Sequence, residues 1–117
     1  MLYIGVDLGT SAVKLLLMDE NGNIQKIVSK EYPLYFPKPG WSEQHPEDWY
    51  IKSMEGMKEL TSECDKSQVA GISFGGQMHG LVALDKDDQV IRPAILWNDG
   101  RTGKQTDYLN QVIGRDK

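Results

Sequence analysis

The alternation of apolar and polar positions predicts that the chain begins as an antiparallel meander. Large apolar and β-favouring residues fill positions 2–8 and, after a small polar interval, positions 13–18. The Asn21-Gly22 pair then favours a type I′ hairpin turn, because both residues tolerate positive φ, and positions 24–32 read as a third strand. We therefore expect three consecutive strands joined by tight turns.

A surface loop is predicted after the meander. Three prolines and Gly40 between positions 33 and 44 oppose regular secondary structure. The aromatic residues of this segment are expected to anchor the loop against the body of the protein. They are Tyr35, Phe36 and Trp41.

The next segment is predicted to be a helix from Pro46 to about Cys64. Proline fits the first helical turn, and the two acidic residues that follow it complement the helix dipole. An apolar stripe along one side of this helix predicts that this side packs in the core. The stripe consists of Tyr50, Met54, Met57, Leu60 and Cys64.

The second half of the chain predicts one buried strand, a second hairpin and a helix. An apolar run at 69–74 ends in Gly75-Gly76, which is typical of a buried strand that leads into an exposed loop. Positions 81–84 and 91–97 flank a polar turn and predict a hairpin, and positions 102–113 predict a helix. This order of elements favours an α/β domain that starts with a meander.

Composition and charge narrow the classes of function. The chain has 117 residues, of which 39% are hydrophobic and 26% charged, as expected for one soluble domain with a single core. A net charge of -4 argues against nucleic acid or an anionic membrane as a partner. Cys64 has no second thiol for a disulfide or a structural zinc site. Without a membrane-length apolar run or a basic signal-peptide start, a cytoplasmic location is expected.

The turn between the first two predicted strands carries a candidate phosphate and metal site. The Asp7 carboxylate can hold Mg²⁺ directly or through water, and Gly9 lets backbone amides approach phosphate oxygens. Thr10 and Ser11 add hydroxyl donors, and Lys14 adds positive charge. A plain hairpin would explain Gly9 but not Asp7, because an unpaired carboxylate in an apolar strand lowers stability. No dinucleotide or P-loop glycine pattern is present.

Two later segments offer groups that suit a polyhydroxylated ligand. Gln77, Met78 and His79 lie among glycines after a predicted core strand, and they combine an amide, a thioether and an imidazole. For His79, a satisfied structural histidine is the alternative. Trp97 and Asp99 can stack on a sugar and hydrogen-bond to it, although Asn-Asp-Gly is also ordinary turn chemistry.

These segments together resemble the FGGY family of carbohydrate kinases. The similar stretches are 4–11, 41–44, 77–80 and 97–101, and the resemblance spans essentially the whole chain. It implies an actin-like, ribonuclease H-like half-domain with a mixed sheet flanked by helices. It also implies that residues 1–117 form the first part of the sugar-binding domain, with the nucleotide-binding domain outside the chain.

The family resemblance implies ATP-dependent phosphorylation of a sugar, here a ketopentose, with Mg²⁺ as the metal. The chain alone is expected to be inactive, because the catalytic base and the adenosine site lie beyond it. The implied partners are the sugar and ATP, without nucleic acid or membrane, and a homodimer of the full-length protein is left open. The implied site residues are Asp7 for Mg²⁺ and the transferred phosphate, Gly9, Thr10, Ser11 and Lys14 for phosphate, and Gln77, Met78, His79, Trp97 and Asp99 for the sugar.

Three alternatives stay open at this point. The substrate can be gluconate or another sugar of the same family. The parent can be an actin-like or chaperone ATPase, which shares the Asp-x-Gly-Thr loop but gives no reason for the segment 77–80. The chain can also be a sugar-binding module without catalytic function.

Overall fold

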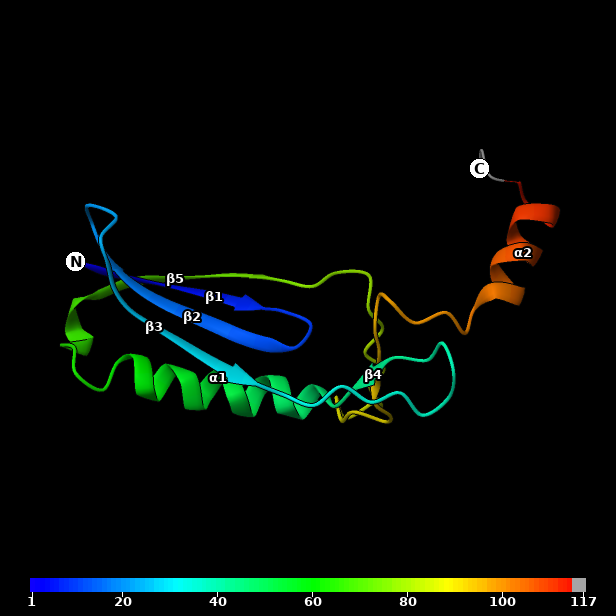
Figure 1. The fold of residues 1–117 in the computed structure, drawn as a ribbon, viewed down its shortest axis with the longest axis horizontal. Helices are drawn as coiled ribbons and strands as arrows, with labels where there is room; N and C mark the ends of the chain where they lie inside the picture. The colour runs from blue at the N-terminus through cyan, green and yellow to red at the C-terminus, as the bar shows by residue number, and fades with distance from the viewer. Residues whose placement is uncertain (115–117) are drawn as a thin grey trace.

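The predicted meander is confirmed by a computed structural model, which describes residues 1–114. Strands β1 (Leu2–Leu8), β2 (Ala12–Asp19) and β3 (Ile24–Glu31) pair antiparallel in sequence order (Figure 1). Alternate side chains of β1 and β2 enter the core, which is the period of two that the sequence pattern indicated.

The turn between β2 and β3 differs from the prediction. Gly22 is at φ 83°, whereas Asn21 is not in the left-handed region that a type I′ turn requires at both central residues. The Gly22 amide donates to the Asp19 carbonyl at 3.1 Å, and the Asp19 amide donates to the Asn23 carbonyl at 3.0 Å. The Asp19 carboxylate also accepts from the Asn21 and Asn23 amides at 2.9 Å. This side chain favours the longer loop, because it satisfies amides that a two-residue turn would not leave free.

Strand β5 (Val69–Gly76) completes a four-stranded mixed sheet. It runs parallel to β1 and gives the order β3-β2-β1-β5. The predicted strand is confirmed, but the prediction that it is buried was wrong, because β5 is an edge strand with Ile72 50% and Phe74 72% exposed. A short 3-10 helix, Lys66–Gln68, precedes it.

Helix α1 (Pro46–Leu60) covers β2 and β3 on one face of the sheet (Figure 1). It ends before Cys64, where the prediction placed its end. The Thr61 hydroxyl and amide both bond to the Met57 carbonyl, at 2.9 and 3.1 Å, and the Ser62 hydroxyl bonds to the Glu59 carbonyl at 2.8 Å. Hydroxyl groups that hydrogen-bond to the carbonyls of the last turn favour termination of the helix over its continuation.

Only the C-terminal part of the predicted stripe on α1 lies in the core. Leu60 is 1% exposed, and Met57 and Cys64 pack against the core from its edge. Tyr50 and Met54 are 68% and 49% exposed, so the prediction was wrong for them. They line an apolar groove of about 500 Å³ between α1 and Phe74 of β5.

The remaining segments form a second, smaller layer. Strands β4 (Glu43–Gln44) and β6 (Ala94–Ile95) pair antiparallel, so the end of the predicted loop is a strand. The predicted second hairpin is reduced to the isolated bridges Leu81↔Ile95 and Leu84↔Val90. Phe36 is 66% exposed and does not anchor the loop.

Helix α2 (Gly103–Val112) confirms the last predicted helix, but it lies away from the sheet (Figure 1). The radius of gyration is 18.4 Å. A compact chain of this length would have a radius of about 13 Å. The expected single core is therefore confined to the sheet and α1. Within residues 1–114, no helix has the length and apolar character needed to cross a membrane.

Candidate functional site

The parallel strands β1 and β5 end side by side, and this brings two predicted site segments together. The Gln77 amide donates to the Leu8 carbonyl at 2.9 Å. A Cβ added at Gly76 would lie 2.9 Å from the same carbonyl oxygen, so this close approach requires glycine. As a result, the turn after β1 and the segment after β5 lie next to each other.

Thr10 is where three predicted segments meet. The Trp97 indole Nε1 donates to Thr10 Oγ1 at 3.1 Å, and Thr10 Oγ1 donates to Gln77 Oε1 at 3.4 Å. These bonds span 87 and 67 residues of sequence. The candidate phosphate turn and both candidate sugar segments therefore form one continuous surface.

Gln44 completes this cluster and was not predicted as a site residue. Its side chain is 1% exposed. Its Oε1 accepts from Trp49 Nε1 at 3.0 Å and from Gln77 Nε2 at 3.2 Å, and its Nε2 donates to the Thr10 carbonyl. Periodicity could not have found it, because strand β4 has only two residues and the sequence around it predicts a surface loop, where polar residues are normally solvated.

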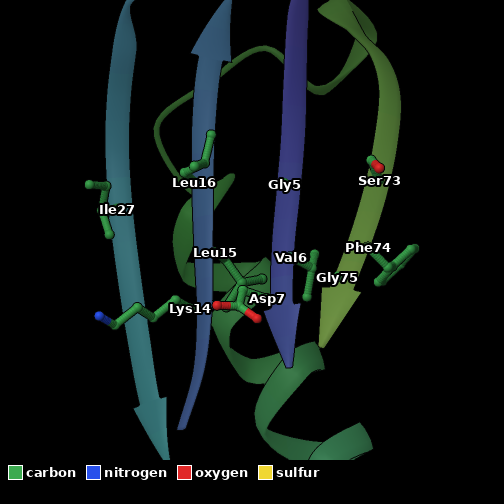
Figure 2. A pocket seen from close by; sticks show the side chains of 10 residues that line it. All are labelled: Gly5, Val6, Asp7, Lys14, Leu15, Leu16, Ile27, Ser73, Phe74 and Gly75. Atoms are coloured by element: carbon green, nitrogen blue, oxygen red, sulfur yellow. The ribbon is translucent and has the colours of Figure 1, made fainter. Parts of the chain in front are cut away.

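Asp7 lies at the end of β1 on the sheet face opposite α1, and its carboxylate is exposed. Figure 2 shows it in a shallow groove of about 420 Å³ that Ser73 and Gly75 also line. Lys14 is its cross-strand partner, but the Lys14 side chain extends over β3, away from Asp7. Among residues 1–114, no ion pair joins the two.

The setting of Asp7 fits a magnesium ion held by one protein carboxylate. Within the described part of the chain, no group of three His, Cys, Asp or Glu side chains could hold a metal together. Magnesium normally retains several waters and takes one or two carboxylates, so a lone exposed Asp7 suits it better than a full protein cage would.

Both backbone groups of Gly9, in the turn after β1, already form hydrogen bonds within the protein. The Gly9 amide donates to the Ala12 carbonyl at 3.0 Å, and the Tyr32 hydroxyl donates to the Gly9 carbonyl. Burial, with a smaller contribution from the negative Asp7, raises the pKa of Tyr32 to about 12. The Gly9 amide is therefore not free to bind phosphate in this conformation.

Met78 and His79 are exposed beyond the end of β5. Met78 is 70% exposed, and His79 has φ 61°, a left-handed conformation that is uncommon for non-glycine residues. Within residues 1–114 the His79 side chain forms no hydrogen bond. The described residues therefore do not satisfy His79 as a structural histidine, and its contact with the sugar stays a prediction.

Asp99 is held in an ion-pair network and does not face solvent. Its side chain is 2% exposed, and its carboxylate accepts from Arg101 Nη2 at 2.7 Å and from the Ser42 amide at 2.6 Å. Arg101 also pairs with the buried Glu43 at 2.7 Å and stacks on Trp41 with its Cζ 3.7 Å from the ring centre. The hydrogen bond from Arg101, followed by the one from Ser42, holds the pKa of Asp99 well below its usual range.

This network ties the loop around Trp41 to the loop around Asp99. Arg92 adds a second cation to Glu43. Trp41 is confirmed as the anchor of its loop, because Arg101 and Lys38 lie over its ring. Sugar contact by Asp99 stays a prediction, and the structure shows Asp99 bonded to Arg101 and to the Ser42 amide.

A family model described as the N-terminal domain of the FGGY family of carbohydrate kinases matches residues 2–117. A xylulose kinase from Bacillus subtilis (strain 168) is 50% identical over 113 residues, which cover 95% of this chain and 23% of that protein. A gluconokinase from the same strain is 33% identical over 99 residues, covering 85% of this chain and 19% of that protein.

Solved structures agree with these sequence relatives. A crystal structure described as a xyloylose kinase from Brucella ovis superposes with a TM-score of 0.89 at 42% identity, covering 95% of this chain and 24% of that one. The chain thus spans about a quarter of the length of the relatives it matches. The fold is that of the actin-like half-domain expected from the sequence.

Proposed function

Since the chain belongs to the FGGY family of carbohydrate kinases, we propose that it is the first part of the sugar-binding domain of an ATP-dependent kinase that converts D-xylulose to D-xylulose 5-phosphate. The observation that carries this proposal is the meeting of three segments at Thr10, where Trp97 and Gln77 both bond to its hydroxyl. The relatives with identities of 41–50% that are named xylulose kinases support this substrate over gluconate.

The residues divide into a phosphate side and a sugar side. On the phosphate side, Asp7 projects from the end of β1 and would hold the magnesium ion through water. That ion would neutralise charge on the transferred phosphoryl group. Gly9, Thr10, Ser11 and Lys14 would line the path of the phosphate.

On the sugar side, the exposed groups are those that suit a ketopentose. His79 can donate or accept a hydrogen bond with a hydroxyl, and Met78 can cover a carbon face of the sugar. Gln77 and Trp97 form the wall that joins them to Thr10, and Asp99 supports that wall through Arg101.

Gluconate is the second candidate substrate, because the Bacillus subtilis gluconokinase is also a relative. Its carboxylate would need a free cation on the sugar side. Arg101, the arginine closest in sequence to Trp97, is already paired with both Asp99 and Glu43. This pairing favours the neutral ketopentose.

The decisive experiment is a coupled assay of ADP formation by the complete protein with D-xylulose and with D-gluconate. We expect turnover with D-xylulose at least tenfold above that with D-gluconate, and none by residues 1–117 alone. Faster turnover of D-gluconate would show that gluconate and not xylulose is the substrate. Turnover by residues 1–117 alone would contradict the need for a second domain.

A further inference from the structure

Gln44 forms a closed ring of side-chain hydrogen bonds with two residues of the candidate site. Gln44 Nε2 donates to the Thr10 carbonyl, Thr10 Oγ1 donates to Gln77 Oε1 at 3.4 Å, and Gln77 Nε2 donates back to Gln44 Oε1 at 3.2 Å. The three residues come from the β1–β2 turn, β4 and the end of β5. No two of them are neighbours in sequence.

The direction of each hydrogen bond in this ring is fixed by neighbouring groups that can only donate or can only accept. The Trp49 indole N–H can only donate, so the Gln44 atom that it meets at 3.0 Å is the oxygen. The Gln44 nitrogen then faces the Thr10 carbonyl, which can only accept. The Trp97 indole N–H likewise leaves the Thr10 hydroxyl proton for Gln77.

We propose that Gln44 is a positioning residue of the kinase reaction, which holds the phosphate turn at Thr10 and the sugar wall at Gln77 at a constant separation. This inference rests on the proposed function, because that proposal assigns Thr10 to the phosphate and Gln77 to the sugar. Gln44 is 1% exposed and lies behind both residues, so it acts through them and not on the substrates.

The physical reason is the geometric demand of phosphoryl transfer. The phosphate and the acceptor hydroxyl must be in line, and misplacement by about 1 Å can lower the rate about a hundredfold. Without Gln44, the two segments would be joined by the backbone bond from the Gln77 amide to the Leu8 carbonyl and by the long Thr10–Gln77 side-chain bond. The amide of Gln44 adds a second side-chain link, because its nitrogen bonds to the Thr10 carbonyl and its oxygen accepts from Gln77.

The first test is a double-mutant cycle in the complete enzyme with D-xylulose and ATP. Gln44→Met keeps the shape of the side chain and removes its hydrogen bonds. We expect kcat to fall tenfold or more, with a smaller rise in the KM for xylulose. Because Gln77→Met opens the same ring, the double variant should be no worse than the worse single variant.

The matched control pairs Gln44→Met with Lys52→Met, which removes the ion pair with Glu55 on the surface of α1, outside the ring. Here the fold-changes in kcat should multiply. If the fold-changes in kcat of Gln44→Met and Gln77→Met multiply in the double variant, the proposal is overturned. So would a Gln44→Met enzyme that melts earlier but keeps wild-type kcat per folded molecule.

A second variant covers the case in which Gln44→Met does not fold. Gln44→Glu retains the acceptor for Trp49 and Gln77 and loses only the donor to the Thr10 carbonyl. Its kcat should be at least tenfold below the wild-type value at about pH 8 and should recover toward wild type by about pH 6. The reason is that burial raises the pKa of the new carboxyl, whose protonated form can donate to the Thr10 carbonyl. A constant ratio to wild type across this range would contradict the inference.

Wild-type turnover separates this inference from the proposed function. If the complete enzyme turns over D-gluconate and not D-xylulose, the same cycle is measured with D-gluconate. If neither sugar is phosphorylated, the proposed function fails and the role of Gln44 fails with it. An active wild type with an unaffected Gln44 variant overturns the inference alone.

Discussion

The indole Nε1 of Trp97 donates a hydrogen bond to Thr10 Oγ1 at 3.1 Å, across 87 residues of sequence. The two side chains come from different layers, one from the loop after β6 and the other from the turn after β1. The ion pairs of Arg101 with Asp99 and Glu43 join the Trp97 loop to the segment that contains Glu43. This single bond joins the sugar side of the candidate site to its phosphate side.

Replacing this indole should separate its two contributions. Trp97→Phe removes the hydrogen bond and keeps an aromatic face, so kcat/KM for xylulose should fall about fivefold, as for loss of about 1 kcal/mol. Trp97→Ala also removes the face and should lower kcat/KM at least fivefold further. Steady-state kinetics of both variants in the complete enzyme will show this order, and equal losses would remove stacking from the role of Trp97.

Asp7→Asn should lower turnover much more than sugar affinity. A neutral amide would hold the magnesium ion poorly, and loss of one preorganised electrostatic group reduces the rate on the order of a hundredfold. Because Asp7 is exposed and unpaired within residues 1–114, the variant should fold normally. A kcat within threefold of wild type would exclude Asp7 from the reaction. Asp107→Asn, which makes the same change on the exposed surface of α2, serves as the control.

His79→Ala should raise the KM for xylulose about tenfold without lowering the melting temperature. An unpaired sugar hydroxyl in a closed site is unfavourable by about 1 to 3 kcal/mol, and about 1.4 kcal/mol corresponds to one decade. His79→Asn should raise the KM less, because asparagine tolerates φ 61° and retains a hydrogen-bonding group. Unchanged xylulose affinity in folded His79→Ala protein would end the assignment of a sugar contact.

The Asp99–Arg101 ion pair should make stability depend on acidic pH. The pKa of Asp99 is lowered in the folded protein, so its stabilising contribution is complete above the unfolded value of about 3.9 and is lost as pH falls below it. The melting temperature of Asp99→Asn should therefore lie furthest below wild type near neutral pH, with the gap closing below about pH 4. Asp107→Asn on the exposed side of α2 should show no such gap.

Gly56→Ala should destabilise the protein although alanine favours helices. A Cβ at Gly56 would lie 2.5 Å from Leu15 Cδ1, and Leu15 is 1% exposed in the core between α1 and β2. Overpacking of about 1 to 3 kcal/mol outweighs the helix-propensity gain of up to about 1 kcal/mol. Gly103→Ala in α2 meets no atom within 4 Å and should leave the unfolding free energy unchanged or higher. Urea denaturation of both variants compares them directly.

Local chemistry determined much of the fold from the sequence alone. The meander, the helix start at Pro46 and the helix at Gly103–Val112 follow from periodicity, turn residues and proline geometry, which act over a few neighbouring residues. The family resemblance was also readable, because it rests on short motifs such as the one around Asp7. The turn at Asn21-Gly22 was misread because the Asp19 carboxylate favoured a longer loop.

Only the tertiary structure decided which polar residues are buried and which apolar residues are exposed. Gln44 is buried because Trp49, Gln77 and Thr10 satisfy its amide, and these partners lie 5, 33 and 34 residues away. Tyr50 and Met54 have the periodicity of core residues but face a groove beside β5, since α1 packs on β2 and β3. Periodicity tells which side of an element is apolar, whereas its neighbours in space decide whether that side is covered and which polar groups find partners.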